Sequence, residues 1–233
     1  MPGVALTWLG HSAFRFDTPG GKRVYVDPFL DNPKCPDGER QPERCDLVLL
    51  THGHADHLGS TVELYQRFDC PVVALLEVRD WLTTKGLPGE DAHAPNKGGT
   101  VRLEGLTVTL TDANHSSSIW ENDTNVYLGE PCGLVIAVEG GSTLYFAGDT
   151  NVFGDMQLIA RIYEPDVAVL PIGDHFTMGP REAAVALELL GVSRCVPCHW
   201  GTFPLLTGTP DELRQLAPGV EVLSPAPGET IEV

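Results

Sequence analysis

The segment Thr51-His52-Gly53-His54-Ala55-Asp56-His57-Leu58-Gly59 decides how the fold of this chain is interpreted. It follows on from residues 46–51, a nearly continuous apolar run with the length of a strand buried on both faces. The first two histidines are two residues apart, so on extended backbone their imidazoles point to the same side. The aspartate and the third histidine come at the predicted turn into a helix. Because imidazoles and a carboxylate suit Zn²⁺, Mn²⁺ or Fe²⁺, the segment predicts a metal site at a strand end.

Three further candidate ligands stand singly in the sequence. His115, Asp149 and His199 each follow a predicted strand. Strand ends of layered α/β domains are where sites are assembled, so these side chains are expected beside segment 51–59. A lone histidine is more often structural than a ligand. Three histidines and an aspartate in one loop are hard to explain as solvated surface, and together the candidates make up two sets of ligands.

The order of the predicted elements indicates a layered α/β domain. Alternation and apolar runs predict strands over residues 4–8, 12–16, 23–26, 46–51, 72–76, 100–103, 106–111, 132–138, 143–147, 167–170, 194–197, 220–223 and 230–233. Helical spacing predicts helices over residues 59–68, 77–85, 155–163, 180–190 and 210–217. Residues 31–45 and 114–131 are expected as polar loops. Since no linker stands out, we expect one domain over residues 1–233, with two facing sheets and helices outside.

The composition excludes several classes of protein. The chain has 233 residues, with 15 Lys and Arg against 32 Asp and Glu, a formal net charge of −17 that argues against a nucleic-acid partner. No apolar run approaches the ~18 residues of a membrane span, so no membrane partner is expected. The first residues lack the features of a signal peptide, which favours a cytoplasmic location and free thiols at the six cysteines.

Residues 51–57 resemble the signature of the metallo-β-lactamase superfamily. Other stretches are similar to one branch of it, the metal-dependent hydrolases related to ascorbate-6-phosphate lactonase. They are residues 8–12, 114–117, 147–150, 153–156, 170–180 and 199–204. The resemblance covers nearly the whole chain. It implies a four-layer αβ/βα sandwich, with metals at one edge of the two sheets.

The same resemblance implies two divalent metal ions and a role for each ligand. One metal ion would be held by His52, His54 and His115, and the second by Asp56, His57 and His199. Asp149 would bridge both. Zinc or manganese is expected, with iron as an alternative, because ligands alone do not fix the metal. Trp200 stands where the branch often has tyrosine, so a hydroxyl that could touch substrate is absent there.

The expected activity is hydrolysis of a small molecule. Two cations that share a water lower its pKa toward ~7, and the resulting hydroxide attacks an ester, lactone or phosphodiester. Asp56 is also expected to orient that hydroxide, and the local charge at the cations allows an anionic substrate. One alternative is an iron-dependent oxidoreductase on the same fold. A second is a haem protein, since Cys195-Val196-Pro197-Cys198-His199 has the spacing of a haem attachment site.

Three residues near the expected ligands have two interpretations each. His175 is a proton donor or substrate contact, or else a structural histidine. His11 orients a ligand from outside the metal shell, or is likewise structural. Asp27 accepts a hydrogen bond from a ligating imidazole, or caps a turn, which the sequence slightly favours. The substrate itself is not encoded in these patterns, and a homo-oligomer is compatible with them.

Overall fold

Two seven-stranded sheets form the centre of the protein. The computed structural model describes residues 3–89 and 92–233. In the first sheet the strand order is β16 (Thr230–Glu232), β1 (Ala5–Trp8), β2 (Phe14–Asp17), β3 (Arg23–Val26), β4 (Leu47–Leu49), β5 (Val72–Val73) and β6 (Ala92–His93). In the second it is β15 (Glu221–Val222), β14 (Arg194–Cys198), β13 (Val167–Pro171), β12 (Thr143–Phe146), β11 (Cys132–Val138), β8 (Leu106–Asp112) and β7 (Thr100–Leu103).

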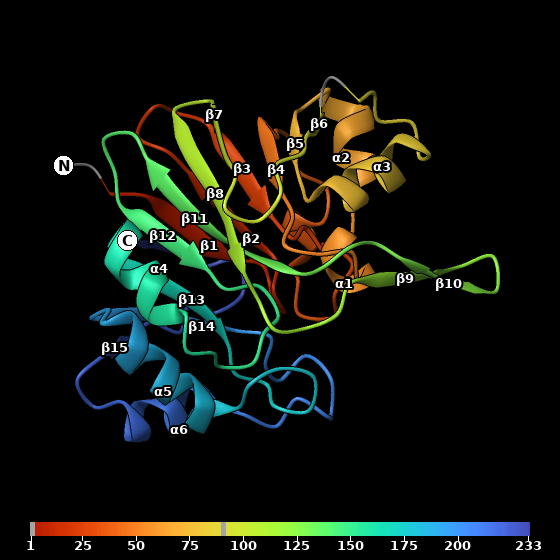
Figure 1. Cartoon of the computed structure of the whole chain (residues 1–233). Coiled ribbons are helices and arrows are strands. Elements are labelled where there is room, and N and C mark those ends of the chain that lie inside the picture. The colour runs from red at the N-terminus through yellow and green to blue at the C-terminus, as the bar shows by residue number, and fades with distance from the viewer. Residues whose placement is uncertain (1–2, 90–91) are drawn as a thin grey trace.

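Helices cover the outer faces of the two sheets, which gives the four layers of the expected sandwich (Figure 1). The helices are α1 (Ala55–Leu58), α2 (Thr61–Phe68), α3 (Leu76–Thr83), α4 (Met156–Tyr163), α5 (Pro180–Leu190) and α6 (Pro210–Leu216), with a short 3₁₀ turn at Asp37–Glu39. The Phe14 and Phe146 rings meet edge to face, 5.5 Å apart, in the core between the sheets. A second core lies between the second sheet and α4–α6. Both cores consist of apolar side chains, whose burial is the main driving force of folding.

Strand direction brings distant parts of the sequence to one edge. β12, β13 and β14 are parallel, and β8 runs the same way because both β8 and β12 are antiparallel to β11. The carboxyl ends of β8, β12 and β14 therefore lie at one edge of the second sheet. In the first sheet β3, β4 and β5 are also parallel. The segments that follow these strands hold the candidate ligands.

The structure differs from the expected elements in three places. The segment expected as one polar loop contains a hairpin of two strands, β9 (Ser118–Glu121) and β10 (Thr124–Tyr127). The expected helix over residues 59–68 begins at Thr61 as α2, and a separate turn, α1, precedes it because Gly59 takes a positive φ that ends α1. The aspartates and prolines around His93 predict a surface loop, whereas the structure places His93 in the edge strand β6, with its side chain exposed.

The cysteines of the haem-like spacing lie on opposite faces of β14. Cys195 packs in the core under the helices, whereas Cys198 packs in the core between the sheets. Successive side chains of a strand alternate between its faces, so two cysteines three residues apart cannot both attach one haem. All six cysteines of the chain are free and buried, as expected. Within the described ranges, no helix has the length and apolar character needed to cross a membrane.

Candidate metal centre

The expected ligands meet at one edge of the molecule, on segments that follow four different strands. His52 and His54 come after β4, and α1 carries Asp56 and His57. The second sheet contributes a single residue beyond each of β8, β12 and β14, namely His115, Asp149 and His199. The cluster therefore joins both sheets.

His52, His54 and His115 form one set of imidazoles. The Nε2 of His52 lies 2.9 Å from the Nδ1 of His54, and the His115 ring is centred 5.3 and 5.1 Å from those of His52 and His54. One nitrogen from each ring lies within 4.8 Å of the others. Ligand atoms that lie 2.0–2.2 Å from one cation are about 3–4 Å from each other. A modest rotation of the rings would therefore let these three nitrogens bind one divalent ion.

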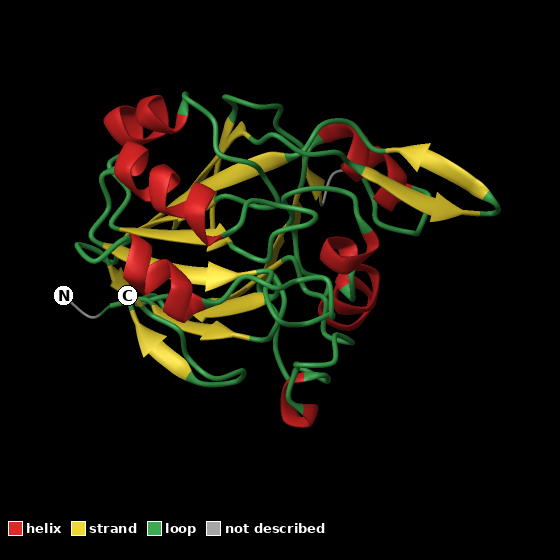
Figure 2. Ribbon diagram, turned by 90° about the horizontal axis from the view of Figure 1, so that it is seen from below, coloured by secondary structure: helices red, strands yellow, loops and turns green. Residues whose placement is uncertain are grey.

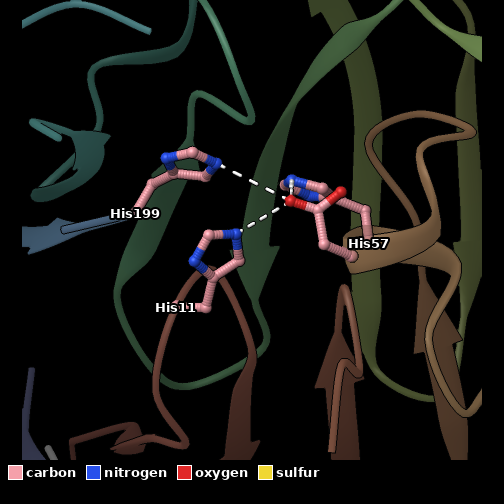
Figure 3. A group of neighbouring side chains, drawn as sticks. His11, His57 and His199 are labelled. Carbon is pink, nitrogen blue, oxygen red and sulfur yellow. Dashed lines mark hydrogen bonds and ion pairs between the residues drawn. The ribbon is translucent and has the colours of Figure 1, made fainter. Parts of the chain in front are cut away.

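Asp56, His57 and His199 form the second set, and His11 joins it. The Oδ2 of Asp56 lies 3.9 Å from the Nε2 of His57 and 3.8 Å from the Nε2 of His199. His11 Nε2 donates to the same oxygen over 2.9 Å. Figure 3 shows the His11 and His199 rings side by side, opposite His57. Buried His11 therefore holds the Asp56 carboxylate in place.

Asp149 reaches both sets. Its Oδ2 lies 3.1 Å from His199 Nε2, 3.3 Å from His57 Nε2 and 3.6 Å from His115 Nε2. Its Oδ1 and the Nε2 of His57 are buried, with no hydrogen-bond partner among the described residues. Buried polar atoms are rarely left unpaired, so these two atoms fit a site built to hold cations.

Asp27 fixes the orientation of the His57 ring. Its buried carboxylate accepts the His57 Nδ1 proton over 2.7 Å, the Thr51 N–H over 2.9 Å and the Thr51 hydroxyl over 2.6 Å. With Nδ1 turned toward Asp27, the Nε2 of His57 faces Asp149 at 3.3 Å and is the nitrogen available to a metal. The sequence slightly favoured a turn-capping role for Asp27. In the structure Asp27 instead accepts a hydrogen bond from the His57 imidazole.

Two glycines allow the ligand segments to pack closely. A Cβ on Gly53 would lie 2.5 Å from Cδ1 of Leu128. A Cβ on Gly148 would lie 2.9 Å from both the Cys132 carbonyl oxygen and the Thr51 Cβ, and Gly148 has φ +63°, in the left-handed region. A side chain at either position would separate the His52–His54 segment from its neighbours.

Burial and neighbouring charges set the protonation of the cluster. Burial lowers the pKa of His52, His54 and His115, which keeps these imidazoles neutral. Burial alone would raise the pKa of Asp149, but His199 and His57 outweigh it and hold that pKa well below its ordinary value. Burial alone would lower the pKa of His199, but the neighbouring Asp149 carboxylate outweighs burial and raises that pKa to about 9. Ionised carboxylates and neutral imidazoles are the forms that bind cations, so His199 must release its proton when a cation binds.

A cavity of about 290 Å³ opens onto the cluster. It is lined by His54, Asp56, His115, Ser116, Asp149, Phe176 and His199. None of these described lining residues is lysine or arginine. The exposed Phe176 ring and the Ser116 hydroxyl are thus the parts of the lining that are not expected ligands.

Two residues considered in the sequence do not line this cavity. His175 is exposed, its ring lies 4.4 Å from that of Phe176, and Phe176 takes the place at the cavity wall. Trp200 stacks on Trp8 at 5.3 Å, with the Lys34 ammonium 4.1 Å above its ring. The structure therefore brings together the expected ligands with His11 and Asp27. His175 and Trp200 lie outside the cavity.

Sequence reasoning missed three contributors to the site. Ser116 Oγ lies 3.3 Å from His54 Nε2, and Ser117 Oγ accepts the Gly53 N–H and donates to the Leu128 carbonyl, each over 3.0 Å. Phe176 supplies the apolar wall. The run of serines after His115 was the available signal, because serines beside a ligand commonly bond to neighbouring backbone.

Comparison with known proteins agrees with this fold and with the class of metal-dependent hydrolases. Residues 22–200 match the model of the Beta-lactamase superfamily domain. A "UPF0173 metal-dependent hydrolase" of Koribacter versatilis is 44% identical over 231 residues, covering 99% of this chain and 98% of the relative. The solved structure of Igni18, described as a novel metallo hydrolase from Ignicoccus hospitalis, superposes with a TM-score of 0.87 at 35% identity, covering 99% of this chain and 98% of its own.

A fold with two facing sheets, helices outside and histidines and aspartates at one edge defines a metallo-β-lactamase-like protein. The chain belongs to the beta-lactamase superfamily and, within it, to the UPF0173 family of metal-dependent hydrolases. The expected fold and enzyme class are thus confirmed. The relation to ascorbate-6-phosphate lactonase stays a prediction.

Proposed function

We propose that this protein hydrolyses a small ester, lactone or phosphodiester with two divalent metal ions at the candidate centre. The observation that carries the proposal is the position of Asp149, whose Oδ2 lies 3.1–3.6 Å from imidazole nitrogens of both ligand sets. A carboxylate shared in this way suits two adjacent cations. Zinc or manganese is proposed, since nitrogen-rich ligands with two carboxylates suit either ion.

Each residue has a defined task in this proposal. One set, His52, His54 and His115, would hold the first cation, and Asp56, His57 and His199 the second, with Asp149 between them. When bound, the cations would supply a hydroxide at neutral pH and stabilise negative charge that develops on the substrate oxygen.

The protein's own groups position that chemistry. His11 donates to Oδ2 of Asp56 over 2.9 Å, and this contact leaves the other carboxylate oxygen available to orient the attacking hydroxide. Phe176 adds an apolar ring to the cavity lining beside the ligand cluster. His175 is proposed as a proton donor only for a substrate large enough to extend past Phe176, because the His175 side chain lies outside the cavity.

The decisive experiment compares two aspartates. The Asp149→Ala variant should lose more than about 99% of the hydrolytic activity and part of the bound metal, because it removes the one ligand common to both sets. Activity would be followed on lactone, phosphodiester and thioester panels with zinc- and manganese-loaded protein, and metal content by elemental analysis. Asp155→Ala is the matched control, since Asp155 is exposed and its side chain makes no capping hydrogen bond to α4. Full activity in metal-free Asp149→Ala would contradict the proposal.

An iron-dependent oxidoreductase is the second candidate. CmlA, described as a diiron beta-hydroxylase from Streptomyces venezuelae, shares the fold with a TM-score of 0.74 at 16% identity, covering 100% of this chain and 55% of its own. At that identity the likeness concerns the fold alone. Oxygen uptake by iron-loaded protein, without hydrolysis of any panel member, would favour this candidate over hydrolysis.

We also propose one domain over residues 1–233 and a cytoplasmic location, with a small molecule as the partner. The net charge of −17 favours a small-molecule partner over nucleic acid, because it opposes binding to a phosphate backbone. Whether the protein forms a homo-oligomer would be read from light scattering of the metal-loaded protein.

A further inference from the structure

A second cavity continues from the metal centre onto the hairpin formed by β9 and β10. It has a volume of about 190 Å³ and is lined by Ser116, Ser117, Ser118, Asn125 and Tyr127. Ser116 also lines the cavity over the ligand cluster, so the two spaces adjoin. The hairpin projects from the body of the protein beyond α1 (Figures 1 and 2).

The inner face of the hairpin holds it in place. Ile119 and Val126 are cross-strand neighbours that pack against the main core. On the same face Glu121 accepts the Trp81 indole N–H of α3 over 3.2 Å and forms an ion pair with Lys85. A two-stranded hairpin on its own is only marginally stable, so these contacts give it a fixed position.

The outer face of the hairpin, by contrast, is exposed to solvent. The strand register places Trp120 opposite Asn125 and Ser118 opposite Tyr127, all on this face. Trp120 is 71% exposed and Tyr127 is 69% exposed. Large aromatic side chains displayed together beside a cavity mark a binding surface rather than ordinary solvated surface.

The lining of both cavities indicates what that surface binds. The described residues of the hairpin cavity are uncharged, and neither cavity has a lysine or arginine in its lining. Phosphate and carboxylate groups are usually bound by such cations, so the group on the hairpin is expected to be neutral. Tyrosine and tryptophan rings attract flat rings by stacking beyond the simple burial of area.

We propose that the outer face of the hairpin, defined by Ser118, Trp120, Asn125 and Tyr127, binds a neutral, planar unsaturated ring in the non-reacting part of the substrate. This inference rests on the proposed hydrolytic function, because it places the scissile ester or lactone bond at the adjoining metal centre. Asn125 and Ser118 offer hydrogen bonds to polar substituents on the ring.

The test uses two esters that differ only in the planarity of a ring, methyl 3-phenylpropanoate and methyl 3-cyclohexylpropanoate. For the metal-loaded protein we expect kcat/KM to favour the phenyl ester at least about tenfold, mainly through KM, which corresponds to about 1.4 kcal/mol. Tyr127→Ala and Trp120→Ala should each reduce this preference several-fold, and Tyr127→Phe should retain it. Thr124→Ala, an exposed position on the inner face, is the matched control. Equal preference in wild type and Tyr127→Ala would overturn the inference.

A binding measurement separates this inference from the proposed hydrolysis. Calorimetric titration with 3-phenylpropan-1-ol, which has no cleavable bond, should give a Kd about tenfold weaker in Tyr127→Ala than in wild type. If the alcohol binds in this way but neither ester is cleaved, the ring site stands and hydrolysis of such esters fails. If both esters are cleaved equally and 3-cyclohexylpropan-1-ol binds as tightly, hydrolysis stands and the ring site fails.

Discussion

Asp27 shows how a single buried carboxylate can organise a metal centre from a distance. It is 2% exposed and accepts hydrogen bonds from the His57 ring and from the backbone N–H and hydroxyl of Thr51. Because Thr51 begins the ligand segment and His57 lies near its end, one carboxylate fixes both ends of that segment. The φ of +45° at Asp27 is uncommon for a residue with a side chain and is maintained by these contacts.

Replacing Asp27 should therefore weaken metal binding without removing a ligand. In Asp27→Asn the amide has one acceptor oxygen, so it cannot satisfy all three donors, and the His57 ring loses its fixed tautomer. Metal affinity should fall about 10- to 100-fold, measured by competition with a chelating dye. Asp31→Asn, an exposed carboxylate in the same region, should bind metal like the wild type. Equal affinity in Asp27→Asn and wild type would show that His57 is oriented by other contacts.

For single residues, the sequence predicts which side chains are candidate ligands better than it predicts which residues contact one another. The candidate ligands could be recognised because four of them stand within six positions and the others follow strands. The role of Asp27 could not be ranked correctly, since it depends on the pairing of β3 with β4, which brings Asp27 beside Thr51. The place of Phe176 at the cavity wall likewise depends on how its loop folds back over the cluster.

At the scale of elements, the close approach between the ligand segment and the chain that leads from the hairpin sets the shape of the site. Gly53 lies against Leu128, and Ser117 bonds to both residues. This packing connects segment 51–59 to the chain directly after β10. The hairpin and the candidate metal centre therefore depend on the same contacts. A change at the contact should affect both.

Gly53→Ala tests that contact. The added Cβ would overlap Leu128, and such overpacking typically costs about 1–3 kcal/mol of unfolding free energy, to be measured by urea denaturation. Metal affinity should fall in parallel, since His52 and His54 flank the displaced residue. The double variant Gly53→Ala with Leu128→Ala should regain part of the metal affinity. Gly154→Ala is the matched control because its added Cβ meets nothing within 4 Å. Wild-type stability in Gly53→Ala would contradict this account.

The expected elements agree best where burial enforces a regular pattern, and also at the edge strand β7, which has no buried residue. The strands β3, β7 and β11 and the helix α5 begin and end where the sequence predicts. The hairpin was missed because its outer face is exposed and its strands are short. Its signal was the pair Asn122-Asp123, whose φ values of +49° and +58° make the tight turn that such dipeptides favour.

At the scale of the whole molecule, metal ions should act as cross-links between the two sheets. The first sheet supplies the ligands of segment 51–59, and the second supplies His115, Asp149 and His199. Periodicity indicated the two halves but could not choose their relative placement, because many layered arrangements satisfy the same alternation. Two facing sheets with helices outside were the simplest arrangement, whereas the choice of the four-layer αβ/βα sandwich came from the resemblance, and the structure confirms that fold.

Removing the metal should therefore lower the stability of the entire fold. At free metal 100 times its Kd, binding to the native state stabilises it by about 2.7 kcal/mol. For a chain of this length, the Tm should fall by about 5–10 °C when a chelator is added, as followed by calorimetry. Asp149→Ala should show a smaller fall. An unchanged Tm in the wild type would mean that the cations contribute nothing to holding the sheets together.

The distribution of ligands over both sheets also orders events during synthesis. His52 leaves the ribosome long before His199, by on the order of 10 s at ordinary elongation rates. In the interval a nascent chain carries exposed imidazoles that hold a cation weakly, without the carboxylate of Asp149 or the final histidine. The expected ligands come together only after β14 has joined the second sheet, so tight metal retention would report that the two sheets have come together.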